Sequence, residues 1–151
     1  MSEWSGGGLR EVWRAGRAGS QFGTPLWLGD LVMVVSGSSE RLAEVVGMDA
    51  GSGEELWRTD LGGDFGRGSW VAWGVRAGEV KGVWPVVGLS ESGDLFAGEA
   101  SRKGLEVRKR VRLFSAPETW TAPVVAEGYL LVARNVGGSG VNPRIMCYRA
   151  R

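Results

Sequence analysis

Three arginines at alternating positions, Arg108, Arg110 and Arg112, have the spacing that most directly suggests a binding chemistry. They belong to the basic stretch at 102–112, RKGLEVRKRVR, which holds six positive residues and one Glu. On a β-strand the three side chains would share one face and could engage phosphate, a lipid headgroup or an acidic partner. A solvated outermost strand, whose charges discourage edge pairing, explains the same pattern without a ligand, and we favour that interpretation.

Residue types that usually carry catalysis or bind metals are scarce. The chain has no His and a single cysteine, Cys147, which excludes His-dependent triads, His-based zinc sites, haem ligation by His and an internal disulfide. The acids are scattered without the spacing of a metal-binding loop. The sequence therefore predicts no catalytic residue and no metal site.

Aromatic side chains offer a second candidate surface. Four of the eight tryptophans, Trp70, Trp73, Trp84 and Trp120, could line a sugar-binding or cofactor-stacking face, because aromatic rings suit flat ligands. The simpler interpretation, which we favour, is that they fill the spaces between packed sheets.

Short apolar runs bounded by turn residues indicate the elements that position these side chains. Glycine makes up 26 of the 151 residues, yet 43% of the chain is hydrophobic, so we expect one folded domain rather than a disordered linker. Turn pairs such as Gly29-Asp30 and Glu127-Gly128 each separate two apolar runs, which predicts antiparallel hairpins. No segment keeps a helical period, and the class is therefore all-β.

An internal repeat defines the organisation of these strands. The segments 25–34 and 123–132 align without a gap 98 residues apart, and near half that spacing Asp49-Ala50 recurs as Glu99-Ala100. A unit of about 49 residues with four short strands has the size of one propeller blade. We therefore predict a partial β-propeller of about three four-stranded antiparallel blades in a single repeat domain at 1–151.

The blades are expected at about 22–61, 65–114 and 119–151. Blade three reaches the end of the sequence before its fourth strand, whereas Leu9–Arg14 resembles the fourth-strand segment Glu54–Arg58. Residues 9–14 are therefore predicted to be a spare outer strand.

The run VGMDAGSGEELWR at 46–58 resembles the repeat of pyrroloquinoline quinone-like (quinoprotein-type) β-propellers. The family pattern of a small residue, Asp, Gly and Trp falls on Gly47, Asp49, Gly53 and Trp57, whereas blade two keeps an acid and a Gly but no Trp. Asp49 can bond the following turn, Gly53 can take a positive φ, and Trp57 offers a large apolar face. The resemblance implies that such tryptophans dock adjacent blades, so these three residues are predicted to be a structural motif.

Two classes of function remain open. The first is a non-catalytic β-propeller module that acts as a binding or assembly scaffold, as in the family's outer-membrane assembly lipoprotein. The second is a fragment of a quinoprotein dehydrogenase, which by the family pattern would need a quinone pocket, calcium ligands, a catalytic Asp and adjacent cysteines. One cysteine and three blades do not supply that site, so we favour the scaffold. No cofactor is predicted, and pyrroloquinoline quinone and calcium are expected only under the alternative.

Charge and hydropathy limit the classes of partner that we expect. The 18 basic and 17 acidic residues leave a net charge of +1, which argues against nucleic acid, and no apolar run reaches the length of a membrane span. The beginning of the sequence shows no secretory signal, while the family resemblance implies a periplasmic or extracytoplasmic place, so the compartment is left open.

A protein partner or self-association into a closed propeller is expected. Two chains with three blades each would make six, with residues 9–14 of one chain completing blade three of the other. If the sequence is instead a fragment of a longer propeller, we expect it to aggregate through its open edges.

Overall fold

The fold consists of three antiparallel β-sheets. The computed structural model describes residues 8–16, 18–19, 23–37, 44–62, 65–73, 82–134 and 142–149, and within these ranges every regular element is a strand. Blade one comprises β1 (Leu26–Leu28), β2 (Leu31–Ser36), β3 (Glu44–Asp49) and β4 (Glu55–Asp60). Blade two comprises β5 (Ser69–Ala72), β6 (Val83–Leu89), β7 (Asp94–Ser101) and β8 (Gly104–Arg112). Blade three comprises β9 (Val124–Ala126), β10 (Tyr129–Arg134) and β11 (Arg144–Arg149). The predicted all-β class is confirmed.

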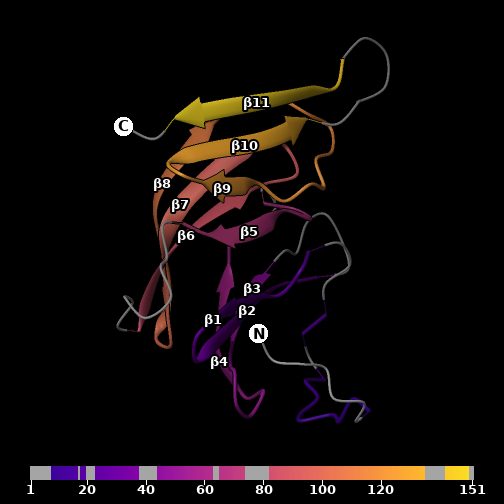
Figure 1. The fold of residues 1–151 in the computed structure, drawn as a ribbon, viewed down its shortest axis with the longest axis vertical. Helices are drawn as coiled ribbons and strands as arrows, with labels where there is room; N and C mark the ends of the chain where they lie inside the picture. The colour runs from indigo at the N-terminus through magenta and orange to yellow at the C-terminus, as the bar shows by residue number, and fades with distance from the viewer. Residues whose placement is uncertain are drawn as a thin grey trace.

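The sheets follow one another along the long axis of the molecule (Figure 1). Each sheet is a meander in which consecutive strands pair, from the first strand of the blade to its last. First strands contact first strands, β1 with β5 and β5 with β9, and the outer strand β4 contacts the outer strand β8. This face-to-face succession of meanders is the arrangement of blades in a propeller, so the chain forms an arc of three blades.

Tight turns explain why the hairpins close where they do. Glu127 and Gly128, which join β9 to β10, have φ values of 49° and 78°. Two-residue hairpin turns with positive φ at both positions match the right-handed twist of the flanking strands. Only a glycine takes such a conformation without strain, which is why the Gly-containing pair marks the turn.

An aromatic cluster fills the space between blades one and two. The Phe65 ring, from the link between the blades, stacks on Trp70 with centroids 5.3 Å apart and meets Phe96 edge-on at 5.2 Å. All three are buried, and so is Trp84, which packs in the same cluster. Trp70 and Trp84 are therefore core residues, as the simpler interpretation of the tryptophans expects.

Residues 9–14 form no strand, which corrects the prediction of a spare outer strand within this chain. A strand requires a neighbour to pair with, and none of the described strands pairs with this segment. Instead Trp13 packs with Ala15 and Ala18 on the face of blade one that points away from blade two, and its indole N–H donates to the Ala50 carbonyl at 3.0 Å.

Replacing Trp57 by Ala should destabilise the fold by about 3 kcal/mol, because the indole packs between blades one and two and its N–H bonds a blade-two carbonyl. Trp27→Ala is the matched control, since the Trp27 side chain on β1 is 64% exposed and its loss should change stability by about 0.5 kcal/mol or less. Urea unfolding followed by circular dichroism measures both. Equal midpoints for Trp57→Ala and the parent would contradict the docking role.

Candidate functional site

The Trp57 indole joins blade one to blade two. It lies flat over Gly47, where an added Cβ would collide with the ring, and its Nε1 donates to the Ser101 carbonyl at 2.8 Å. Ser101 ends β7, so the bond reaches the turn between β7 and β8 of the next blade. A large apolar face and one directional hydrogen bond together fix how the two sheets sit.

Asp49 caps the turn after β3 and also reaches blade two. Its Oδ1 accepts hydrogen bonds from the backbone N–H of Gly51 at 2.9 Å and of Ser52 at 2.8 Å. Its Oδ2 accepts from the guanidinium of Arg102 at 2.6 Å. The Arg102 hydrogen bond, followed by those from Ser52, lowers the pKa of the Asp49 carboxyl to about 2. Asp49 is thus held as a carboxylate that ties a turn of blade one to a turn of blade two.

Gly53 completes the same turn. Its φ is 73°, and its N–H donates to the Asp49 carbonyl at 2.8 Å. A Cβ at this position would also collide with the Trp13 ring. All three residues of the predicted motif therefore lie in contacts that shape or join blades, and none of them lines the larger cleft between blades two and three.

The arginines of β8 are paired with acids of their own sheet. A bulge sets Val107 and Lys109 opposite consecutive residues of β7, so Arg108 does not share one face with Arg110 and Arg112. Arg108 bonds Glu99 at 3.0 Å and Glu106 at 3.3 Å. Arg110 and Arg112 both bond the buried carboxylate of Asp94, at 2.6 Å and 2.5 Å. The expected common face is therefore corrected, because Arg108 lies on the opposite side of the sheet from Arg110 and Arg112.

A charged cluster at the links between blades also consists of side chains that pair with one another. Arg67 bonds the carboxylate of Glu91 through its side chain at 2.5 Å and through its backbone N–H at 3.1 Å, and it also reaches Glu118 at 3.3 Å. Burial alone would raise the pKa of Glu91, but the hydrogen bonds and charge of Arg67 outweigh it and the pKa is lowered. Glu91 is thus a buried, paired carboxylate rather than a poised acid.

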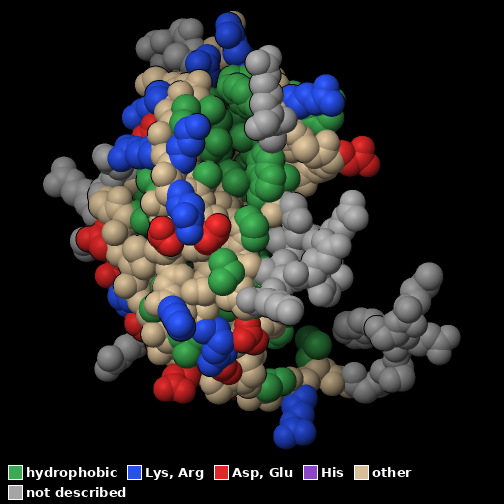
Figure 2. Space-filling view, turned by 90° about the vertical axis from the view of Figure 1, so that its left-hand side faces the viewer, with side chains coloured by type: hydrophobic (Ala, Val, Ile, Leu, Met, Phe, Trp, Pro, Cys, Tyr) green, Lys and Arg blue, Asp and Glu red, His purple; other side chains and the backbone are tan. Residues whose placement is uncertain are grey.

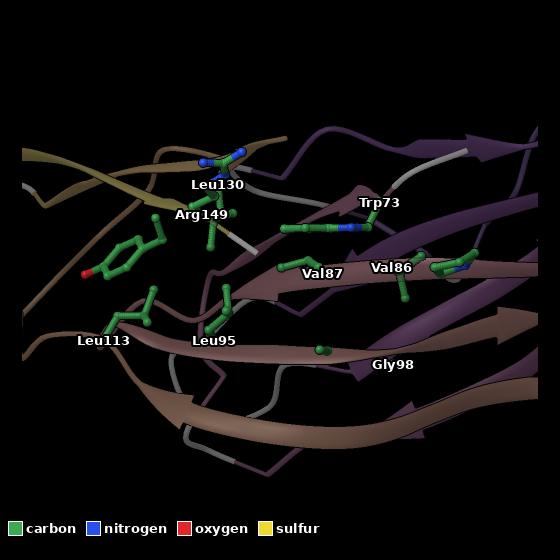
Figure 3. A pocket seen from close by; sticks show the side chains of 11 residues that line it. Trp73, Val86, Val87, Leu95, Gly98, Leu113, Leu130 and Arg149 are labelled. Atoms are coloured by element: carbon green, nitrogen blue, oxygen red, sulfur yellow. The ribbon is translucent and has the colours of Figure 1, made fainter. Parts of the chain in front are cut away.

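The feature best suited to binding is an apolar cleft between blades two and three. It encloses about 410 Å³ and is lined by β6 and β7 of blade two, by the segments beside them, and by β10 and β11 of blade three. Hydrophobic side chains gather over these blades in the upper half of Figure 2. In the close view, Leu130 and Arg149 lie across the cleft from Leu95 and Gly98, and the Trp73 ring lies beside Val87 (Figure 3).

A missing tryptophan explains why this cleft is open. In blade one, Met33 pairs with Gly47 and Gly47 with Trp57, whose ring closes the space toward the next blade. In blade two, Val87 pairs with Ala97 and Ala97 with Lys109. The Lys109 side chain is exposed and does not line the cleft, so an apolar space remains where blade one has an indole.

Sequence reasoning missed two features that the structure brings together. Arg102 belongs to the basic stretch, and nothing in its spacing indicates a bond to a residue 53 positions earlier. The cleft could have been predicted from the sequence. The blade-two repeat lacks the Trp of blade one, and a missing indole indicates an unfilled space. Of the four tryptophans weighed as a stacking surface, Trp73 does line a cavity.

The described residues hold no cluster of three or more His, Cys, Asp or Glu side chains that could bind a metal ion. Nor do they include a helix of the length and hydropathy needed to cross a bilayer.

No model of a known protein family matches the chain, and no curated protein sequence does. Among 17 matching solved structures are BamB from Moraxella catarrhalis and the WD40 domain of SCAP from fission yeast. The BamB match has 15% identity and a TM-score of 0.40, and covers 73% of this chain and 28% of that one. The SCAP match has 12% identity and a TM-score of 0.46, and covers 78% of this chain and 31% of that one. This chain thus spans less than a third of the length of either.

Asp49→Asn should reduce the dependence of stability on acid. The pKa of Asp49 is about 2 in the fold against 3.8 for the free side chain, so its stabilisation is present above about pH 4 and is lost as the pH falls toward 2. Asn keeps the turn hydrogen bonds but carries no charge for Arg102. Urea midpoints at pH 7 and pH 2 are expected to differ less in the variant than in the parent. An unchanged difference would contradict the assignment of the low pKa to Asp49.

Proposed function

We propose that this chain is a non-catalytic β-propeller module that binds extended polypeptide in the cleft between blades two and three. The observation that carries this proposal is the cleft itself, an apolar cavity of about 410 Å³ beside β11, a strand that among the described residues pairs only with β10. A free strand edge offers backbone hydrogen bonds to an incoming strand, and an adjacent apolar space accepts its alternate side chains.

The composition of the cleft supports binding over chemistry. Its wall is apolar except for the Trp73 indole N–H, the Tyr148 hydroxyl and the Arg149 guanidinium, and it contains no carboxylate. The carboxylates of Asp49, Glu91 and Asp94 lie elsewhere and are engaged by arginines. A general acid or base would need to stand within hydrogen-bond reach of a bound substrate, and the wall offers only the Tyr148 hydroxyl, which donates to the Met146 sulfur at 3.6 Å.

The proposal includes the quinoprotein resemblance only for the way in which the blades pack. We infer that the Asp49, Gly53 and Trp57 motif reflects quinoprotein-type blade packing, without the cofactor chemistry of the enzymes. Calcium binding requires several oxygen ligands, which the cleft wall does not offer. The same resemblance favours a periplasmic or extracytoplasmic place of action.

Peptide-display selection against the whole chain should enrich extended sequences with aromatic or aliphatic residues at alternate positions. Their affinity should fall at least tenfold, about 1.4 kcal/mol, in the double variant Ala97→Gly/Lys109→Trp, which recreates the Gly47 and Trp57 pair and fills the cleft. Lys103→Trp, an equal change in the exposed β7–β8 turn, is the control and should leave the affinity unchanged. Failure to enrich peptides, or equal binding to the filled-cleft variant, would refute the proposal.

Titration with pyrroloquinoline quinone and calcium separates the scaffold from the enzyme. No saturable site in the micromolar range is expected by absorbance or tryptophan fluorescence, because the described residues offer no group of calcium-binding acids. Stoichiometric binding of the quinone would instead favour the dehydrogenase fragment.

A further inference from the structure

Blades two and three each contribute one aromatic side chain to the cleft between them. Trp73, which follows β5 of blade two, and Tyr148 of β11 in blade three both line this space. The backbone N–H of Trp73 donates to the Pro85 carbonyl at 2.9 Å, so the pairing of β5 with β6 extends to this residue. The Trp73 ring lies beside Val87 in the wall (Figure 3). The cleft is therefore an apolar space with an aromatic residue from each sheet.

The polar side chains of this wall are mainly hydrogen-bond donors. The Trp73 indole and the Arg149 guanidinium can only donate. The Tyr148 hydroxyl can also accept, and its O–H donates to the Met146 sulfur, a weak acceptor, at 3.6 Å. No hydrogen bond of the Trp73 indole is found among the described residues. The wall can thus donate hydrogen bonds to a ligand but can accept few in return.

The backbone of the three central strands of the wall adds no acceptor. β6, β7 and β10 each pair with a strand on both sides, so their carbonyls are bonded within the sheets. An amide N–H that entered the cleft would leave water without gaining a partner, and a buried, unpaired donor costs free energy. The wall therefore suits a polypeptide that has few N–H groups and free carbonyls.

We propose that the polypeptide bound in this cleft is rich in proline and adopts the polyproline II conformation. This inference rests on the proposed function and names the class of its ligand. Proline has no backbone N–H, so its apolar ring enters the cleft without leaving a donor unpaired. A polyproline II helix makes no internal hydrogen bonds, so its carbonyls are free to accept from the Trp73 indole and the Tyr148 hydroxyl.

The junction between blades one and two shows the same indole chemistry satisfied within the chain. There the Trp57 N–H donates to the Ser101 carbonyl at 2.8 Å. A carbonyl of the bound polypeptide gives Trp73 the acceptor that Ser101 gives Trp57. Proline-rich chains already populate polyproline II before they bind, so little conformational entropy is lost when they dock in an aromatic-lined groove.

Isothermal titration calorimetry of the whole chain with a blocked peptide of about ten prolines tests the inference. We expect saturable binding in the micromolar range. In a matched peptide alanine replaces every second proline. Because the helix repeats about every three residues, this change places N–H groups on all of its sides and should weaken binding about tenfold.

A third peptide with N-methylalanine at the alanine positions is the control for the N–H group. It has the same methyl side chains but no N–H at these positions, so it should recover most of the lost affinity. The absence of saturable binding of the proline peptide up to about 1 mM would overturn the proposal. Equal binding of the alanine and N-methylalanine peptides would also overturn it.

Variants of the chain test the aromatic contacts. Trp73→Phe keeps an aromatic ring but removes the indole N–H, and should weaken binding of the proline peptide about tenfold. Trp27→Phe makes the same change at a side chain on β1 that is 64% exposed and lies outside the cleft, and should leave the affinity unchanged. Tyr148→Phe removes only the hydroxyl and should weaken binding about threefold. Circular dichroism checks that each variant is folded, and Tyr148→Phe decides the test if Trp73→Phe is not. Affinity equal to the parent's in the folded cleft variants would overturn the proposal.

Failure of this inference is distinguishable from failure of the proposed function. Selected peptides without proline that bind the parent but not Ala97→Gly/Lys109→Trp would overturn the inference and leave the cleft as a polypeptide site. If neither the selected peptides nor the proline peptide binds the parent, both are overturned.

Discussion

An indole N–H that reaches from an outer strand to a turn carbonyl of the next blade is the contact on which the arc depends. Trp57 makes it to Ser101, and Trp13, from a segment that forms no strand, makes a similar bond to the Ala50 carbonyl of blade one. Sheets with flat apolar faces could slide over one another at little cost, because hydrophobic burial has no direction. The indole adds a directional bond to a large buried face, and the Asp49–Arg102 pair reinforces it at the same end of blade one.

The proposed binding site lies at the junction between blades two and three, where the outer strand β8 carries no docking tryptophan. Between blades one and two, Trp57 joins an aromatic cluster with Phe65 and Trp70. Between blades two and three, Lys109 stands at the tryptophan position, and the buried cluster is mostly aliphatic. The space of about 410 Å³ that results is a cleft with a mostly apolar wall between two sheets. A change in one packing residue thus leaves an open apolar cleft at a blade interface.

The strand pattern, the repeat and the docking motif could be predicted from the sequence, because turn glycines and alternating apolar residues determine structure locally. It failed where the outcome depends on partners distant in the chain. Arg108, Arg110 and Arg112 looked like a shared basic face, but a bulge and the acids of β7 redistribute and pair them. Residues 9–14 carry an outer-strand sequence, yet they form no strand, because a strand needs a paired neighbour and none of the described strands pairs with them.

Native-state hydrogen exchange tests directly whether tryptophan docking sets the strength of each junction. The amides of β10 and β11 should exchange through an opening that costs less free energy than the opening of β2, β3, β6 and β7, because the outer strand β8 carries no tryptophan that docks on blade three. Installing the pair with Ala97→Gly/Lys109→Trp should raise the protection of β10 and β11 toward that of the other blades. Equal protection of all three blades in the parent would contradict the account.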